Sequence, residues 1–365
     1  MAGLKVRAGG RYIDATVGDG GHTAEILKKG GIVLGLDRDE MAIERTRQRF
    51  ETEIEKGKLT LMKSNFDKLN EIVASFAPVS SLAKFARSPA RLATRSVAGR
   101  PSPIAIASGK PLAALGVASD GSSLTRKFAN FANFGGAKPT DKGFDGILFD
   151  LGMSSGQIEE SGRGFSFQKD EPLDMRMDPE LAVTAADLVN GLGKKELFEL
   201  FVKLGQVERA KAVAEAIVRG RREKPIKTTA ELAGLVEKVL PRKGRLHPAT
   251  KVFMALRMAV NDELGSLERA LPQATELLAS EGRLAVISFH EGEDRIVKRF
   301  FRENCQLEEI NRKPIQAGAD EVNVNPRARS AKLRIAEGAP NQSYFASWST
   351  STPAKSDGTG FGRNS

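Results

Sequence analysis

The feature that most limits the possible fold is a regular alternation of short apolar strands and helical segments near the start of the chain. Strands and helices take turns over residues 11–16, 22–29, 31–37, 39–55 and 59–66. Such an alternation is typical of a parallel sheet whose crossover helices cover its faces. The sequence therefore predicts an α/β fold with a Rossmann-like sheet.

Further strands are separated from this unit by a long helical region. Apolar runs at 144–152 and 282–290 indicate buried parallel strands, and two later strands are expected near 306–315 and 329–336. Residues 184–280 carry apolar residues at helical spacing instead. We predict a helical module between the fourth and fifth strands, and this module is the candidate for substrate recognition.

Two helix ends and six segments can be predicted from the same patterns. Thr228 or Thr229 is expected to cap the start of one helix, and Gly282 is expected to end the last helix before the fifth strand. The sheet domain is expected in three pieces, and the predicted segments in chain order are 1–77 (sheet), 78–142 (insertion), 143–183 (sheet), 184–264 (helical module), 265–337 (sheet) and 338–365 (tail).

The insertion at 78–142 holds most of the basic charge of the chain. The whole chain has a net charge of +10, and residues 80–143 contain ten Lys or Arg residues against two Asp. This segment is rich in Ser, Ala, Gly and Pro, a composition typical of disorder, as is that of the tail. Of three interpretations, an RNA-binding arm, an assembly tail and a neutral insertion, we favour the neutral insertion.

The turn after the first strand predicts a bound cofactor. Gly18, Gly20 and Gly21 let the backbone approach a ligand, and the following helix offers free N–H groups. Asp37 ends the second strand, where an acid can accept the hydroxyls of a ribose. Dinucleotides and S-adenosylmethionine (SAM) both use such a site. An oxidoreductase that uses NAD therefore stays open as an alternative.

Two residues in this turn favour SAM over a dinucleotide. Thr23 stands where the dinucleotide pattern places its last glycine or alanine. Asp19 lies where a pyrophosphate would sit, and its carboxylate would repel that anion. SAM carries a sulfonium and an ammonium group, which nearby carboxylates stabilise.

The fourth strand leads into the densest polar stretch of the chain. Asp150 is expected at the carboxyl end of this strand, and Ser154, Ser155 and Gln157 follow it. Ligands of open α/β sheets bind beyond the carboxyl ends of the strands. This loop is therefore expected to complete the cofactor site.

Several long motifs resemble one known family. "DATVGDGGHTAEIL", "LGLDRDEMAI", "DGILFDLGMSSGQIEESGRGFSFQKDEPLDMRMD", "HPATKVFMALRMAVNDELGSLERAL", "GRLAVISFHEGEDRIVKRFF" and "NPRARSAKLRIAE" are similar to successive signatures of the RsmH (MraW) family. Its members are SAM-dependent methyltransferases that modify the exocyclic N4 of one cytidine in the decoding region of small-subunit (16S) ribosomal RNA. The resemblance covers roughly residues 11–77, 143–300 and 311–337, and we know of no family counterpart for 78–142.

The resemblance implies a class I methyltransferase sheet with an all-helical substrate-recognition subdomain, and a set of site residues. Asp150 would act in catalysis, where it or the carbonyls of Leu151 and Gly152 would accept protons of the target amine. The SAM contacts would be Gly20, Gly21, His22, Asp37, Phe66, Asp150 and Gln157. The chain departs from the family at Glu291 and Gly292, where Ser and Leu are usual.

The resemblance also implies ribosomal RNA as the partner, within an assembled or late-assembling small subunit. The oligomeric state stays open, with a homodimer as one alternative, and so does a catalytically inactive RNA-binding derivative. Aromatic and polar residues near the predicted cleft are Phe165, Phe167, His247, Lys251, Arg257 and Asn261. Basic groups that could meet phosphates lie in the helical module, at Arg219, Arg221, Arg222, Lys224, Arg242, Lys243 and Arg245, and in a late strand, at Arg327, Arg329, Lys332 and Arg334.

Three further expectations come from residues that the chain lacks or holds singly. Three histidines far apart and a single cysteine predict no metal site. Cys305 is expected to be a small buried residue, which argues against an enzyme that attacks cytosine C5 through a thiolate. No apolar run reaches the roughly 20 residues of a membrane span, so we expect a cytoplasmic protein without a membrane partner.

Overall fold

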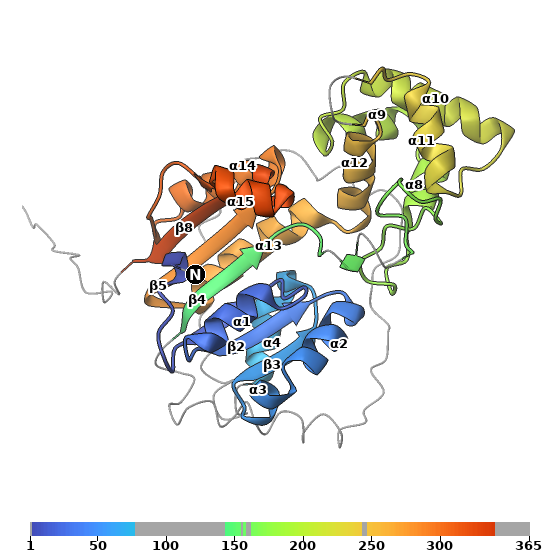
Figure 1. Cartoon of the computed structure of the whole chain (residues 1–365). Helices are drawn as coiled ribbons and strands as arrows, with labels where there is room; N and C mark the ends of the chain where they lie inside the picture. The colour runs from blue at the N-terminus through green and yellow to red at the C-terminus, as the bar shows by residue number, and fades with distance from the viewer. Residues whose placement is uncertain (1, 77–142, 155, 158–161, 243–246, 340–365) are drawn as a thin grey trace, which may run out of the picture.

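The computed structural model describes residues 2–76, 143–154, 156–157, 162–242 and 247–339, and these form one eight-stranded sheet with two sets of helices. Along the sheet the order is β3-β2-β1-β4-β5-β8-β6, with β7 paired to β8 (Figure 1). The strands are β1 (Arg11–Asp14), β2 (Ile32–Asp37), β3 (Leu59–Lys63), β4 (Phe144–Asp150), β5 (Leu278–Ser288), β6 (Leu307–Glu309), β7 (Ile315–Gln316) and β8 (Lys332–Gly338).

The first five strands are parallel and β8 runs antiparallel to β5. β2 is buried except at its two ends, and most residues of β4 are buried. These strands are therefore continuous apolar runs in the sequence. The prediction of an α/β fold, with a Rossmann-like sheet and an inserted helical module, is confirmed.

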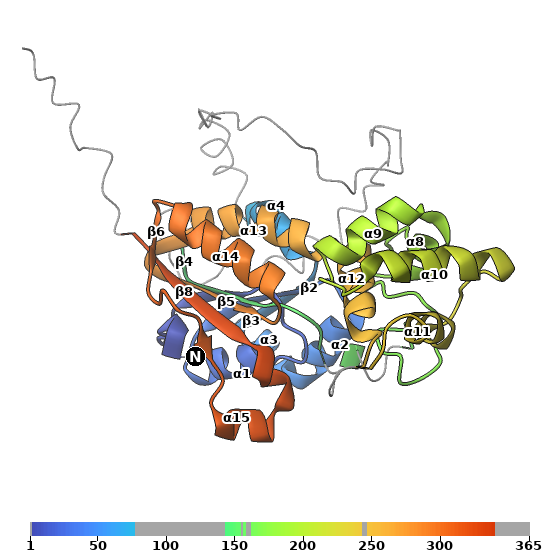
Figure 2. The same cartoon turned by 90° about the horizontal axis from the view of Figure 1, so that it is seen from above.

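Helices cover both faces of the sheet, as Figure 2 shows. On one face lie α1 (Gly21–Lys28), α2 (Glu40–Arg49) and α3 (Glu51–Glu55). On the other lie α4 (Leu69–Ser75), α13 (Glu263–Leu277) and α14 (Glu291–Glu303). Each face has its own apolar cluster, so the sheet is buried between two layers of helices.

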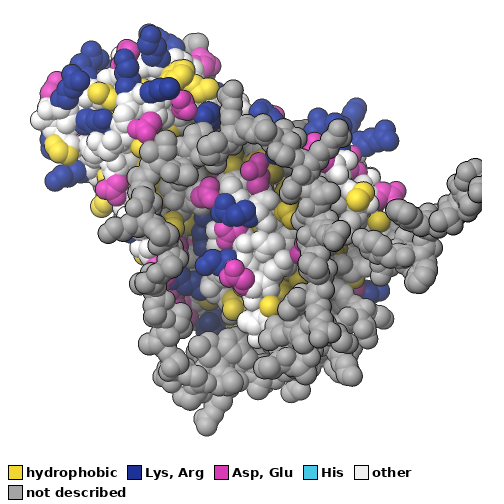
Figure 3. All heavy atoms as spheres, turned by 180° about the vertical axis from the view of Figure 1, so that it is seen from behind, with side chains coloured by type: hydrophobic (Ala, Val, Ile, Leu, Met, Phe, Trp, Pro, Cys, Tyr) yellow, Lys and Arg dark blue, Asp and Glu magenta, His cyan; other side chains and the backbone are white. Residues whose placement is uncertain are grey.

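Five helices form the helical module beside the sheet (Figure 1): α8 (Ala185–Gly191), α9 (Lys194–Lys203), α10 (Ala210–Glu223), α11 (Thr229–Glu237) and α12 (Thr250–Val260). Their apolar faces share a separate core, which also includes Phe165 and Leu173 from the loop after β4. Thr228 caps α11 as predicted, because its side chain accepts a hydrogen bond from the backbone N–H of Glu231. Lys and Arg side chains are scattered over the visible face of this module, among acidic and apolar side chains (Figure 3).

The helical module is tied to the sheet domain through buried polar contacts at one joint. Asn261 follows α12, and its side chain accepts from the backbone N–H of Met177 at 2.8 Å and donates to the carbonyl of Met175 at 2.8 Å. The guanidinium of Arg163 pairs with Asp39, the N-cap of α2, at 3.0 Å. These contacts fix the position of the loop after β4 against the second strand's end.

Some predicted boundaries were wrong. The helix expected to end at Gly282 is α13, which ends at Leu277, and Gly282 lies inside β5. Its position there is explained by close packing, because a Cβ on Gly282 would sit 2.8 Å from the carbonyl oxygen of Phe144. The predicted strand 59–66 ends at Lys63, and Phe66 begins a short 3-10 helix, η2 (Phe66–Lys68).

A short helix that was not predicted from the sequence, α15 (Ala319–Val324), precedes another 3-10 helix, η4 (Pro326–Ser330). The boundaries predicted for the six segments of the chain remain a proposal. The expectations for 78–142 and for the tail beyond residue 339 lie outside the described residues. In the part of the chain that the structure describes, no helix has the length and apolar character needed to span a membrane.

Replacing Asn261 with alanine should destabilise the protein, because it leaves the buried N–H of Met177 and the carbonyl of Met175 without partners. We expect the free energy of unfolding to fall by about 2–4 kcal/mol, measured by equilibrium urea denaturation. Asn323→Ala in α15, an exposed position, is the matched control and should change stability by less than about 0.5 kcal/mol. Equal stability of the two variants would show that the joint contributes little.

Candidate functional site

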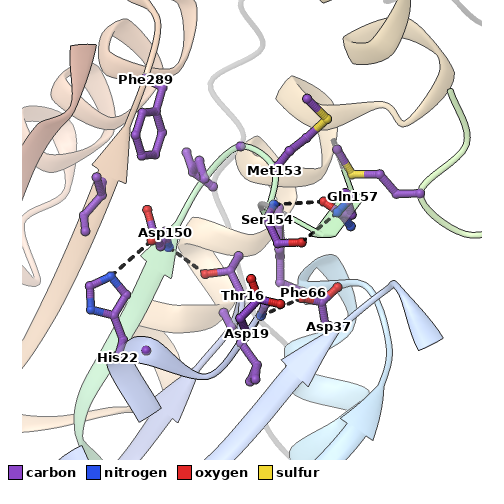
Figure 4. A pocket seen from close by; sticks show the side chains of 18 of the residues that line it. Thr16, Asp19, His22, Asp37, Phe66, Asp150, Met153, Ser154, Gln157 and Phe289 are labelled. Atoms are coloured by element: carbon purple, nitrogen blue, oxygen red, sulfur yellow. Dashed lines mark hydrogen bonds and ion pairs between the residues drawn. The ribbon is translucent and has the colours of Figure 1, made fainter. Parts of the chain in front are cut away.

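A cavity of about 540 Å³ lies beyond the carboxyl ends of β1, β2 and β4. These strands end in Asp14, Asp37 and Asp150, and Asp37 and Asp150 line the cavity together with His22, Phe66 and other side chains (Figure 4). Parallel strands bring their carboxyl ends to one edge, so residues far apart in the sequence meet there. This is the place where the sequence predicted a ligand.

The glycine turn shapes one wall of the cavity. Gly18 and Gly20 adopt left-handed backbone conformations, with φ of 52° and 76°. A Cβ on Gly20 would lie 2.6 Å from the Phe50 ring, so this residue faces α2 and is absent from the lining, although its backbone caps α1. Gly21 does line the cavity, and a Cβ there would meet no atom within 4 Å. The wall at Gly21 is therefore open backbone.

Asp37 is partly buried at the end of β2, and its carboxylate is held by the backbone. One oxygen accepts from the N–H of Gly18 at 2.9 Å and the other from the N–H of Asp39 at 2.8 Å. Desolvation raises the pKa of Asp37 to about 6, although these two hydrogen bonds act in the opposite direction. The side chain thus joins the glycine turn to the second strand and changes its charge at mildly acidic pH.

Asp150 lies between His22 and Thr16 at the end of β4, as Figure 4 shows. Its Oδ2 atom is 3.1 Å from Nε2 of His22, and its backbone N–H donates to the Thr16 hydroxyl at 2.7 Å. The hydrogen bond with Asp150 raises the pKa of His22. The Oδ1 atom of Asp150 is buried and has no hydrogen-bond partner among the described residues. A buried carboxylate oxygen in that state favours a donor group from a ligand in the cavity.

The remaining predicted contacts, Phe66 and Gln157, also line the cavity. The Phe66 ring packs edge-on against Phe149 of β4, with ring centroids 5.5 Å apart. Gln157 and Ser154 exchange hydrogen bonds, because each side-chain oxygen accepts from the other residue's backbone N–H, at 3.1 and 3.3 Å. Six of the seven predicted cofactor residues therefore face one cavity, and Gly20 supports its wall from behind.

The cavity is strongly acidic. Apart from His22, two arginines line it, Arg38 and Arg327, against six acids: Asp19, Asp37, Asp150, Glu263, Glu293 and Glu321. Arg45 and Arg257 pair with Asp19 and Glu263 but do not themselves line the cavity. Such a wall favours a cationic ligand over a pyrophosphate.

Several residues expected near the cleft have other roles in the structure. Phe165 is in the core of the helical module, and Phe167 stacks on His247 with centroids 4.4 Å apart. Arg257 forms a largely buried pair with Glu263 at 2.7 Å. None of these four, nor Asn261, lines the acidic cavity. A helical spacing shows which residues share a face but not what that face packs against.

Two expectations about burial were also wrong. Arg334, predicted to reach RNA, is buried in β8 and pairs with Asp294 at 2.7 Å. Cys305, predicted to be buried, is exposed in the connection between α14 and β6. It lines a separate cavity of about 460 Å³ between α13 and α14. No group of three or more His, Cys, Asp or Glu residues in the described ranges is placed to hold a metal ion.

Arg38, Phe289 and Glu293 are among the residues of the cavity wall that were not predicted from the sequence. Arg38 follows Asp37 directly; its guanidinium donates to the carbonyl of Asn261 at 2.9 Å and lies over the Phe66 ring at 6.0 Å. Phe289 and Glu293 follow β5, and the Glu293 carboxylate accepts from the N–H of Phe289 at 2.8 Å. The motif "SFHEGEDR" could have indicated Phe289 and Glu293, because it stands at the carboxyl end of the fifth parallel strand, where ligands bind.

Comparisons with known proteins agree with this geometry. Relatives named "Ribosomal RNA small subunit methyltransferase H" are 40% identical in Acidobacterium capsulatum, 38% in Cyanothece sp. and 36% in Limosilactobacillus fermentum. Each alignment covers 92% of this chain and, respectively, 94%, 91% and 95% of the relative. Among solved structures, an rRNA methylase from Streptococcus thermophilus reaches a TM-score of only 0.35 at 10% identity, over 93% of this chain and 90% of its own, and supports no conclusion.

The family model described as "MraW methylase family" matches residues 1–84 and 112–339. It therefore extends into both ends of the segment 78–142, for which we had expected no family counterpart, and leaves 85–111 unmatched. The matched ranges include every residue of the cavity wall. This chain belongs to the MraW methylase family.

Proposed function

We propose that this protein transfers a methyl group from SAM to the exocyclic N4 amine of a cytidine in the decoding region of small-subunit ribosomal RNA. The observation that carries this proposal is the acidic cavity at the strand ends, which Asp150 lines. Family membership supports methyl transfer. The names of the relatives support small-subunit ribosomal RNA as the substrate.

The cavity residues fit SAM in charge and in hydrogen-bonding capacity. Asp37 would accept ribose hydroxyls, Phe66 would pack on the adenine, and the ligand would approach the backbone at Gly21, since all three residues line the cavity. His22 and Gln157 complete the set, and the surrounding carboxylates stabilise an ammonium and a sulfonium. When bound, SAM supplies a methyl group on a positively charged sulfur, which is already strongly electrophilic.

The residues of the chain then have one main task, which is to orient the cytosine amine. This amine is a poor nucleophile because its lone pair is delocalised into the ring, so alignment with the methyl group is decisive. The Asp150 carboxylate would accept a proton of the amine through Oδ1, which has no hydrogen-bond partner among the described residues, and His22 holds the other oxygen. The carbonyls of Leu151 and Gly152, which also line the cavity, are further acceptors.

No protein nucleophile is required for methylation of an amine. Cys305 lines the cavity between α13 and α14 and is not part of the acidic cavity, so it is not placed to attack a base there. The target base must leave its stack to reach Asp150. Phe289 lies at the cavity wall, where its ring can pack on the base. A ribosomal substrate within the small subunit is consistent with the cytoplasm as the site of action.

Replacing Asp150 with asparagine should reduce kcat by about 10²–10⁴-fold, because the amine loses its charged acceptor and His22 loses its partner. SAM affinity should fall as well. The assay is transfer of a labelled methyl group to assembled small subunits and to naked ribosomal RNA, followed by mass spectrometry of the nucleosides. The wild-type protein should produce N4-methylcytidine, with assembled subunits as the better substrate.

The matched control is Asp145→Asn, at the opposite end of the same strand, where the carboxylate pairs with Arg7. This variant should retain its activity. Full activity of Asp150→Asn would exclude the proposed role of Asp150. A methyl group on any atom other than N4 would exclude the proposed product.

SAM binding should weaken as the pH falls through about 6, because Asp37 must be ionised to accept the ribose hydroxyls and its pKa is about 6. We expect the Kd to rise by up to about tenfold for each pH unit below this value. The folding stability of the free protein depends on pH in the opposite direction. The pKa is raised above its unfolded value, so ionisation of Asp37 between about pH 4 and 6 lowers stability.

Calorimetric titration with SAM between pH 5 and 8 measures this dependence. Asp37→Asn should bind weakly and lose the pH dependence below 6, whereas His22 is unchanged in that variant. Glu308→Gln, an exposed carboxyl of β6, is the control and should behave as the wild type. The role of Asp37 is refuted if the variant keeps the wild-type pH profile.

A further inference from the structure

Another cavity, of about 420 Å³, lies between the helical module and the sheet domain and adjoins the acidic cavity. It is distinct from the cavity at Cys305 and is called the second cavity below. Phe289 lines both cavities. The 3-10 helix η4 also borders both, because it contributes Ala328 to the acidic cavity and Arg329 to the second one. The two cavities are therefore neighbours, with Phe289 at their boundary.

The second cavity has the opposite charge. Three cations line it, Lys251, Arg329 and Lys332, against one acid, Glu291. The Lys251 ammonium donates to the carbonyl of Gln206 at 3.3 Å and has no ion pair with a described carboxylate. Arg329 is exposed and likewise pairs with no described carboxylate. Two of the three cations thus remain available to an anionic ligand.

The backbone around these cations is held firmly on both sides of the cavity. A Cβ on Gly205 would lie 2.6 Å from the carbonyl oxygen of Lys251, so the turn after α9 packs directly on α12. On the other side, Lys332 begins β8 and is in register with Ser288 of β5. The cavity is therefore built from regular elements of both domains.

We propose that the second cavity holds a phosphate of the RNA backbone next to the target cytidine. This inference rests on the proposed function. An uncharged base can enter the acidic cavity, but its attached phosphates are repelled by the carboxylates there. The second cavity adjoins the acidic one at Phe289. Lys251 and Arg329 would therefore meet the RNA backbone phosphates just outside the acidic cavity.

Glu291 moderates this subsite. Its carboxylate pairs with the ammonium of Lys332 at the edge of the cavity, and Glu291 is itself largely exposed. A phosphate that enters must compete with this carboxylate for Lys332. Loss of the Glu291 charge should therefore strengthen RNA binding, whereas loss of Lys251 and Arg329 should weaken it. These opposite signs distinguish a phosphate subsite from a structural role of the same residues.

The test is the affinity for a fluorescent RNA with the sequence of the decoding region, measured by anisotropy at several KCl concentrations. In K251A/R329A the Kd should rise by about tenfold or more. The slope of log affinity against log salt should become shallower by about 0.7 for each phosphate that the variant no longer neutralises. Glu291→Gln should lower the Kd by about two- to threefold. SAM affinity, measured by calorimetry, should be unchanged in all variants, which shows that they are folded.

The matched control is K211A/R302A, which removes the same two charge types from exposed positions of α10 and α14. Its Kd and salt slope should equal those of the wild type. An equal weakening of RNA binding in both double variants would show an effect of net charge alone and would overturn the proposal. So would an unchanged Kd in K251A/R329A.

Failure of this proposal is distinguishable from failure of the proposed function. If the wild type binds RNA through Lys251 and Arg329 but transfers no methyl group, the phosphate subsite stands and the activity does not. If the wild type methylates N4 while K251A/R329A has the KM and salt dependence of the wild type, the activity stands and the subsite does not.

Discussion

The position of β1 between β2 and β4 governs the arrangement of the whole site. Asp14 is in register with Gly35 of β2 and with Leu148 of β4, so Asp37 and Asp150 each stand two residues further along the neighbouring strands. Asp14 itself is fully buried; it accepts from the Thr23 hydroxyl at 2.7 Å and anchors α1. Burial raises the pKa of Asp14. The central strand thus stays behind the cavity while its neighbours supply the functional carboxylates.

The separation of charge between the two cavities follows from which elements supply their side chains. The acids of the first cavity come from the ends of β2 and β4, from the turn after β1 and from the helices α13, α14 and α15. The second cavity takes Lys251 from the helical module, and Arg329 and Lys332 from the segment before and at the start of the antiparallel strand β8. A cationic cofactor and a polyanionic substrate would each meet a surface of opposite charge. We regard this separation as the physical basis for keeping phosphates away from the cofactor cavity.

Much of the fold and the strand-end residues could be predicted from the sequence, because both depend on local patterns. The apolar runs before Asp37 and Asp150 are long enough to identify buried strands, and the rule that ligands bind at carboxyl ends places both residues in one cavity. The glycine turn alone left the cofactor open, since dinucleotide and SAM sites share it; family membership favours the methyl donor.

Residues whose role depends on tertiary packing were harder to predict. Phe167 and Arg334 looked available for RNA, but the former stacks on His247 and the latter pairs with Asp294, both distant in the sequence. The exposure of Cys305 and the position of Gly282 inside β5 depend in the same way on contacts between remote elements. Phe289 reaches the cavity only because β5 lies next to β4 in the sheet.

The most direct test of the central claim, that the strand-end carboxylates form a site for a cationic methyl donor, is a calorimetric titration of the full chain at pH 8. SAM and NAD should be compared under the same conditions. We predict saturable binding of SAM with one molecule per chain and no binding of NAD. Binding of NAD without binding of SAM would contradict the account.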